Sequence, residues 1–293
     1  MSFQYGGQAV IEGVMMRGPS RRAVAVRRPD ETIAINEKPM GSITQRLPFL
    51  KLPFIRGVVM LFESLIMGIE ALSYSAEQAM GEEEEEKISK WEMALTIAFS
   101  LGLAIVLFIV LPTTLIYYAG SGIQDNFLRN VIEGIVRLAV FLGYVVAVSR
   151  MKDIRRVFMY HGAEHKVINA YEAGKELTVQ EVQRFSTLHP RCGTSFLLIV
   201  ILIKVVIFSG VTASGLFGQI FFRVLLLPVV AGVAYELLKL SGKYQDKGLC
   251  KIFIAPGLWL QKLTTNEPDD AQVEVAIKAF DAVRKEGDVV HVR

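Results

Sequence analysis

Residues 93–119 have the sequence MALTIAFSLGLAIVLFIVLPTTLIYYA, which carries no charged side chain. A helix needs about 20 apolar residues to cross the hydrocarbon core of a bilayer, so this stretch predicts a membrane-spanning helix. Its single proline, Pro112, is compatible with such a helix when neighbours satisfy the carbonyl that proline leaves free. The fold is therefore expected to be organised around membrane helices.

The composition of the whole chain agrees with a membrane protein. Apolar residues make up 52% of the 293 residues, and the mean hydropathy is +0.39. Soluble domains rarely contain so much apolar surface, so part of it is expected to face lipid. The net charge of +3 argues against nucleic acid as a partner, because duplex binders usually have a strongly basic face. Cys192 and Cys250 lie far apart in the sequence, which predicts no disulfide and a reducing environment.

Three further apolar stretches are long enough to span a membrane. They run from about Val131 to Val148, from Thr194 to about Phe217, and from about Gln219 to Leu240. Together with residues 93–119 they predict a mainly α-helical, polytopic membrane bundle of about four transmembrane helices.

Ionisable residues inside these stretches are costly at membrane depth and need a reason. Glu133 and Arg137 are four residues apart and are expected to offset each other near an interface. Arg223 and Glu236 lie near helix ends and are expected to extend to the membrane surface. Lys204 lies close to the middle of its stretch, where a lysine often marks a transport pathway.

Basic residues flank the predicted spans unevenly. The connector after the first span holds only Arg129, and the connector after the third holds none. Most flanking basic residues follow the second and fourth spans, at Arg150, Lys152, Arg155, Arg156, Lys239, Lys243, Lys247 and Lys251. Because positively charged loops stay in the cytoplasm, both termini and the loop 150–193 are expected on the cytoplasmic side.

The segment 54–80 is apolar but polar on one face. Its charged residues recur every seven positions, at Arg56, Glu63, Glu70 and Glu77. This pattern favours an amphipathic helix on the inner leaflet over a polar-lined helix inside the bundle. The acidic run 82–86 is expected to be a solvated spacer before the first span.

The two ends of the chain contain shorter elements. Alternating side chains around a turn predict a small β-hairpin over residues 23–35. The glycine-rich stretch 6–19 is expected to form a tight loop, with Glu12 and Arg17 as further site candidates. At the other end, residues 249–263 suggest an interfacial segment, and Asp269 or Asp270 caps a final helix.

These patterns divide the chain into six parts. The first three are a cytoplasmic N-terminal segment with the hairpin (1–53), the amphipathic helix with its spacer (54–90) and a first helix pair (91–150). The last three are a loop with polar residues (151–193), a second helix pair (194–241) and a cytoplasmic C-terminal part (242–293).

The loop contains the residues most able to carry chemistry. His161, Glu164 and His165 have the H-x-x-E-H spacing, in which two histidines one helical turn apart converge on a metal ion. In the related zinc protease motif the glutamate is the general base. Glu172 follows His165 by seven residues and is expected on the same helix face. Two imidazoles and a carboxylate form a common catalytic zinc set with one open position.

A second pair of metal-binding residue types follows at His189 and Cys192. A short helix that begins at Thr178, with a capping box completed by Glu181, is expected to return this pair toward His161. Roles without a metal stay open for the polar residues of this loop. Arg191 and Lys166 suit an anionic headgroup or phosphate, and Cys192 suits a small buried position.

The chain resembles a known family in four blocks, GGQAVIEGVMMRGP, YHGAEHK, TLHPRCGTSF and PGLWLQKLTT, which begin at residues 6, 160, 187 and 256. They are similar to the signature blocks of the bacterial YqhQ family of membrane proteins, a domain of unknown function that is often labelled a predicted metal-dependent enzyme. The resemblance covers nearly the whole chain. It implies a bacterial cytoplasmic membrane protein with a metal at His161 and His165, and His189 and Cys192 are the next matching positions.

Two functions follow as hypotheses. The first is a zinc hydrolase at the cytoplasmic membrane face, with Glu164 as general base and a membrane-protein segment or a lipid-linked molecule as substrate. The second is a scaffold, insertion factor or transporter in which a structural metal or polar cluster closes the loop. Membrane lipids are partners in either case.

Overall fold

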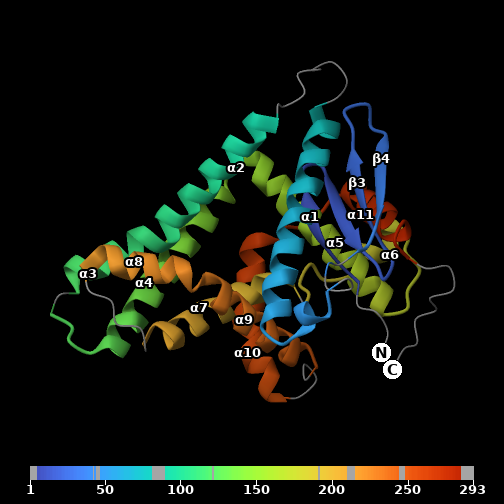
Figure 1. Ribbon diagram of the computed structural model, residues 1–293. Helices are drawn as coiled ribbons and strands as arrows, with labels where there is room; N and C mark the ends of the chain where they lie inside the picture. The colour runs from blue at the N-terminus through green and yellow to red at the C-terminus, as the bar shows by residue number, and fades with distance from the viewer. Residues whose placement is uncertain are drawn as a thin grey trace.

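The computed structural model describes residues 5–41, 43, 47–80, 90–120, 122–190, 192–209, 215–243 and 248–284. The described chain is mainly helical and has one antiparallel sheet near its N-terminus (Figure 1). The four strands are β1 Gly6–Val10, β2 Gly13–Arg17, β3 Arg21–Arg27 and β4 Ile33–Pro39. The helical segments are η2 Pro48–Lys51, α1 Ile55–Met80, α2 Lys90–Ile105, η3 Val106–Val110, α3 Leu111–Ala119, α4 Asn126–Val148, α5 Lys152–Glu172, α6 Val179–Val182, α7 Thr194–Ser209, α8 Gly215–Leu225, α9 Leu227–Lys243, α10 Gly248–Thr264 and α11 Asp270–Asp281.

The sheet is a meander in which each strand pairs with the next, in the order β1-β2-β3-β4. The hairpin predicted over residues 23–35 is confirmed as β3 and β4, with Val24 opposite Asn36. The loop predicted over residues 6–19 is wrong, because this stretch forms β1 and β2. Its glycines serve close packing: a Cβ on Gly7 would lie 2.4 Å from the Met15 carbonyl oxygen and 3.0 Å from Glu164 Cγ.

Both faces of the sheet are covered. On one face β2 and β3 pack against α5 and α11 through Val14, Met16, Ala23 and Ala25. On the other face α1 covers a second cluster, which consists of Val10, Met15, Val24, Val26 and Ala71. The strict alternation of these side chains along β2 and β3 explains why the sheet is buried on both sides.

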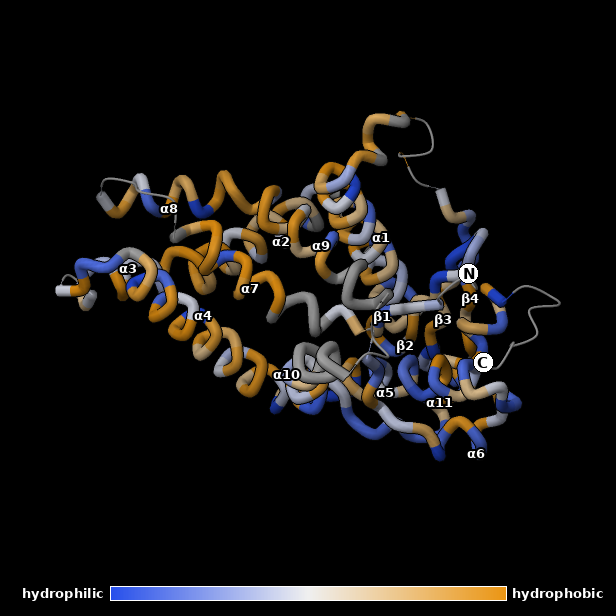
Figure 2. The backbone as a smooth tube through the Cα atoms, turned by 90° about the horizontal axis from the view of Figure 1, so that it is seen from below, coloured by the Kyte–Doolittle hydropathy of each residue, from blue (hydrophilic) through white to orange (hydrophobic). Residues whose placement is uncertain are grey.

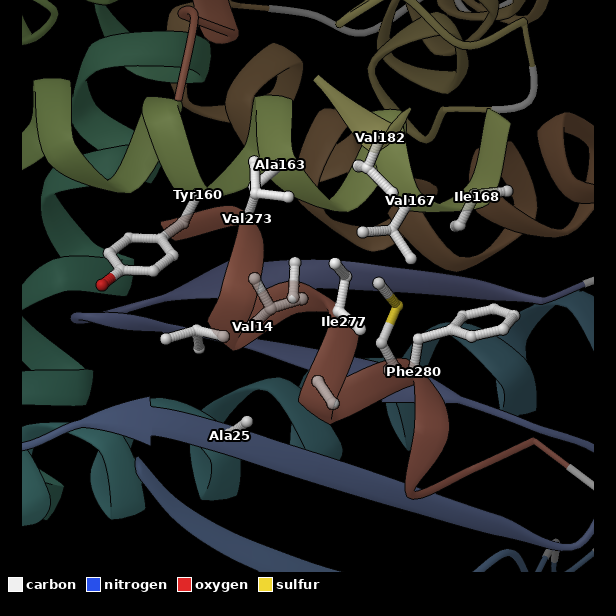
Figure 3. Close-up of a cluster of buried hydrophobic side chains, with 14 of the residues drawn as sticks. Val14, Ala25, Tyr160, Ala163, Val167, Ile168, Val182, Val273, Ile277 and Phe280 are labelled. Atoms are coloured by element: carbon white, nitrogen blue, oxygen red, sulfur yellow. The ribbon is translucent and has the colours of Figure 1, made fainter. Parts of the chain in front are cut away.

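Helix α11 packs against both α5 and the sheet and completes the larger core (Figure 3). The predicted cap is confirmed at Asp269, whose carboxylate accepts from the Gln272 N–H at 2.8 Å in a reciprocal capping box. Phe280 is fully buried, and its ring centroid is 4.9 Å from that of Tyr5 and 4.7 Å from that of Tyr171. The last helix of the described residues therefore packs against the N-terminal strands.

The polar face of α1 is turned toward the protein. Glu70 accepts from Arg22 of β3 at 2.6 Å, and Arg56 forms a salt bridge with Glu236 of α9. The expectation that Glu236 extends to the membrane surface is therefore wrong. The opposite face of α1 exposes Phe62, Leu65, Ile66 and Ile69, so both the interfacial helix and the polar-lined helix inside the bundle stay predictions. The acidic run 82–86 lies outside the described residues.

Two helices are long and apolar enough to cross a membrane, Ala94–Ala119 and Phe127–Val148. A third candidate is the pair Gly215–Leu225 and Leu227–Leu237, which bends by 43° just before Pro228. The apolar helix Ile199–Phe208 is shorter than a span. The prediction of four clear spans is thus confirmed in part, as two or three. Figure 2 shows these helices as the most hydrophobic part of the chain.

Candidate metal centre

Helix α5 carries the central motif, and its middle turns are buried. His161 and His165 lie one turn apart, with ring centroids 4.5 Å apart. Gly162 permits the chain that follows α10 to touch the helix, since a Cβ there would lie 2.1 Å from the Asn266 carbonyl oxygen. The Asn266 N–H donates to the Phe158 carbonyl at 2.9 Å and completes this contact.

Both imidazoles are held by backbone carbonyl oxygens. His161 Nδ1 lies 2.8 Å from the Thr264 oxygen, and His165 Nδ1 lies 2.5 Å from the Thr187 oxygen. A carbonyl only accepts hydrogen bonds, so Nδ1 must carry the hydrogen in each ring. Nε2 is then the atom of each ring that could bind a metal ion, which is the arrangement found around ligating histidines.

Cys192 joins the two histidines in a compact group. Its Sγ lies 3.4 Å from His161 Nε2, and the potential ligand atoms of His161, His165 and Cys192 all lie within 4.8 Å of one another. Imidazole and thiolate are preferred zinc ligands. The donor atoms therefore fit a zinc ion with three protein ligands.

Glu164 lies beside this group. Its Oε2 is 3.4 Å from His165 Nε2, and the residue is 4% exposed. A proton shared between these two atoms, or a cation bound by both, would make this contact favourable.

His189 and Glu172 are near the group but outside its compact set. The ring centroid of His189 is 5.7 Å from that of His165, and its Nε2 is 3.5 Å from Glu172 Oε2. This buried nitrogen has no hydrogen-bond partner among the described residues. Burial lowers the pKa of His189, and the charge of Glu164 only partly opposes this effect, so the imidazole is neutral at pH 7. A ligand role for His189 and Glu172 stays a prediction.

The segment 183–192 returns to α5 as expected. Thr178 caps α6 by accepting from the Glu181 N–H at 3.3 Å, although the Glu181 carboxylate pairs with Arg184 rather than closing a capping box. Lys166 is committed to the protein, with its Nζ 2.8 Å from the Gln183 carbonyl oxygen and 2.8 Å from Glu267. Lys166 is therefore not available to a headgroup, and Arg191 lies outside the described residues.

Sequence reasoning missed the side chains that hold this segment. The fully buried Gln261 amide bonds the His189 backbone twice, accepting from its N–H and donating to its carbonyl at 2.9 Å each. Asn169 donates to the carbonyls of Ser186 and Leu188 at 2.8 and 3.1 Å. The signal for Gln261 was present, because it lies in the block 256–265 that carries the family resemblance.

Glu12 and Arg17 have different surroundings. Glu12 lies in the β1–β2 turn with a φ of 50° and accepts from Arg156 at 2.6 and 2.5 Å, which fixes the turn on α5. Arg17 donates to Ser64 at 3.3 Å, and Glu164 is among the charges that act on it. Burial lowers the pKa of Arg17, and Arg22 adds to this effect. A site role for Glu12 or Arg17 stays a prediction.

Comparison with known proteins identifies the family. A model described as protein of unknown function (DUF1385) matches residues 52–286. The chain belongs to this family. It is also 38% identical over 288 residues to the uncharacterized protein YqhQ of Bacillus subtilis (strain 168), and the match covers 94% of this chain and 91% of that protein. The predicted resemblance to the YqhQ family is confirmed. No solved structure matches the chain.

The DUF1385 match includes every residue of the histidine centre. It begins after β4 and ends after α11, so it covers α5, the segment 183–192 and α10. The sheet lies outside the matched residues, although β1 packs directly on Glu164. In this DUF1385 chain, a part of the protein outside the family match thus contacts the carboxylate residue beside the histidine group.

Proposed function

We propose that the protein is a membrane-embedded zinc-dependent hydrolase with its centre at His161, His165 and Cys192. The observation that carries the proposal is the compact three-ligand group with a carboxylate beside it. Catalytic zinc sites typically have three protein ligands, whereas structural sites have four. Glu164 lies close enough to act on a molecule at the open position without being part of the compact group.

The chemistry follows from the roles of the side chains. A zinc ion with an open position lowers the pKa of water there to about 7. With such an ion held by His161, His165 and Cys192, the Glu164 carboxylate would accept the proton of the attacking water and would give it to the leaving group. The Thr187 and Thr264 carbonyls hold His165 and His161 in the tautomer that this chemistry needs.

The position of the centre supports a substrate reached from the membrane. Cys192 lies two residues before α7, an apolar helix, and α10 with its exposed Trp259 packs against α7. Tryptophan is enriched at membrane interfaces. A segment of a membrane protein or a lipid-linked molecule at the cytoplasmic face is the proposed substrate, and the surrounding lipids are partners.

The packing of the larger core supports four crossings. Its buried residues come from the stretches 5–25, 160–182 and 273–283. A single core lies on one side of a bilayer, so the chain must cross the bilayer an even number of times between one of these stretches and the next. Between residues 182 and 273 the bent pair α8–α9 alone would give one crossing, and α7 supplies the second. The basic flanks support the proposal that this side is the cytoplasmic side of a bacterial cell membrane.

Metal analysis of the purified protein tests the centre. We expect about one zinc ion per chain, in keeping with one three-ligand group. His161→Ala should lose it, and the matched variant His189→Ala should retain it because His189 is outside the compact group. Glu164→Gln should bind zinc normally but lose hydrolysis of peptide or ester probes. Metal-free wild-type protein of normal stability would contradict the proposal.

A structural zinc site is the second candidate, and one observation favours it. Within the described part of the chain, the buried Nε2 of His189 has no hydrogen-bond partner and is near His165. If this nitrogen completed the shell, the site would be closed. Cobalt-substituted protein distinguishes the two, because azide or a hydroxamate changes the visible spectrum only where a coordination position is open. A spectrum unchanged by both ligands would establish the closed site.

A further inference from the structure

A second cluster of charged side chains is buried among the apolar helices. Glu133 of α4 is 3% exposed, and Arg223 of α8 donates to both of its oxygens, at 2.8 and 2.5 Å. Arg137 donates to Glu133 Oε1 at 2.6 Å, and Thr113 donates to the same oxygen at 3.1 Å. The predicted Glu133–Arg137 pair is confirmed. The expectation that Arg223 extends to the membrane surface is wrong, because it turns inward to this carboxylate.

A proline in the first span makes a backbone carbonyl available to this cluster. Pro112 has no N–H to donate to the carbonyl four residues earlier, at Phe108. That carbonyl lies in the π-helical segment η3 and accepts from Arg137 Nε at 2.7 Å. Arg137 is at the middle of the candidate span Phe127–Val148. In a helix that spans a bilayer, the middle is the depth where a charge is most costly.

Lys204 of α7 adds a further positive charge. Helices α4 and α7 approach closely beside it, since a Cβ on Gly134 would lie 2.8 Å from Val205 Cγ2. Lys204 is within electrostatic reach of Glu133, Arg137 and Arg223. Among the described residues its ammonium forms no hydrogen bond or ion pair. The group thus contains three basic side chains and one carboxylate, whose oxygens are already engaged by the two arginines.

We propose that this cluster binds a phosphate group at Lys204 and the neighbouring Arg137. An uncompensated positive charge among apolar helices favours an anion, and lysine and arginine are the side chains that bind phosphate. The Lys204 ammonium and Arg137 Nη1 carry N–H groups without a partner among the described residues. The phosphate comes from a lipid headgroup or from free phosphate. Neither source involves the histidine centre, so this site is independent of the proposed hydrolase.

Thermal unfolding in uncharged detergent tests the site with two probes. One is inorganic phosphate against chloride at equal ionic strength, and the other is short-chain phosphatidylglycerol against a zwitterionic lipid. We expect at least one probe to raise the melting temperature by roughly 5 °C at saturation. A rise with phosphate alone identifies the free ion, and a rise with the lipid alone identifies the headgroup.

Variants assign the effect to the cluster. Lys204→Met should abolish the rise, Lys204→Arg should retain it, and Arg129→Gln, which removes a charge from α4 outside the cluster, should also retain it. No rise with either probe, or an equal rise in Lys204→Met, overturns the proposal. If Lys204→Met does not fold, native mass spectrometry of the wild type in anionic-lipid nanodiscs decides: one retained phosphorus-containing anion per chain supports the site, and none overturns it.

Discussion

Gly162 follows His161 on α5, at the point where the chain after α10 crosses the helix. The Asn266 carbonyl occupies the space in which a side chain would begin. The same crossing brings the Thr264 carbonyl to His161 Nδ1. Because Gly162 has no side chain, the chain after α10 can approach closely enough for the Thr264 carbonyl to orient His161.

We predict that Gly162→Ala lowers the free energy of unfolding by about 1–3 kcal/mol, because a backbone oxygen 2.1 Å from the new Cβ must move. Zinc affinity should fall with it, since the Thr264 carbonyl moves away from His161. Thermal unfolding and metal content check both effects. Gly143→Ala is the control, since a Cβ there meets nothing within 4 Å and alanine suits a helix better than glycine. A Gly162→Ala protein that melts like the wild type would refute the close-packing argument.

At the residue level the sequence predicted which side chains come together, but not which backbone carbonyls hold them. The four-residue spacing of His161 and His165 and the nearby Cys192 predicted a group that the structure brings together. The carbonyls of Thr187 and Thr264 could not be predicted, because every residue has a carbonyl and only the tertiary fold selects one. A seven-residue offset places Glu172 about 10 Å along the helix from His165, which explains why Glu172 lies beside His189 and outside the compact group.

The elements that support the centre lie at opposite ends of the chain. Helix α5 packs on β1 and β2 on one side and on α11 on another. Helical and strand patterns were predictable where side chains alternate or a cap is present, as at β3, β4 and α11. The strands β1 and β2 were not, because glycines that serve close packing look the same in sequence as glycines that serve a turn.

The packing of α11 predicts a large effect at one position. Phe280→Ala should destabilise the protein by about 3–5 kcal/mol, as for other fully buried phenylalanines. The effect should appear as a lower melting temperature, with loss of metal at temperatures where the wild type retains it. Lys278→Ala, on the exposed side of the same helix, should leave both unchanged. Equal melting temperatures for the two variants would show that α11 is not part of the core.

At the scale of the whole molecule, one core joins three stretches that the candidate spans separate. Hydropathy predicted the first two spans because they are long and uniformly apolar. It could not predict that the last apolar stretch bends by 43° at its middle, since a proline kink depends on what the neighbouring helices offer. Nor could it place Arg223 and Glu236, whose partners lie on helices far away in the sequence.

Reporter fusions check the proposed topology. A reporter fused after residue 284 should report the cytoplasm, and alkaline phosphatase inserted between α3 and α4 should be active outside. The informative insertion lies between α7 and α8. With four crossings it is active outside, and inactivity there would mean that neither α7 nor the bent pair crosses.

Helix α11 is synthesised long after the sheet that it covers. Residues 5–25 leave the ribosome first, whereas the helix that completes their core begins at residue 270. At about 5–20 residues per second the ribosome needs roughly 10–50 seconds to make the chain between them. The apolar face of the sheet must stay protected during that time, while the spans insert. Chains that terminate early would therefore reach the membrane but remain exposed to proteases and aggregation.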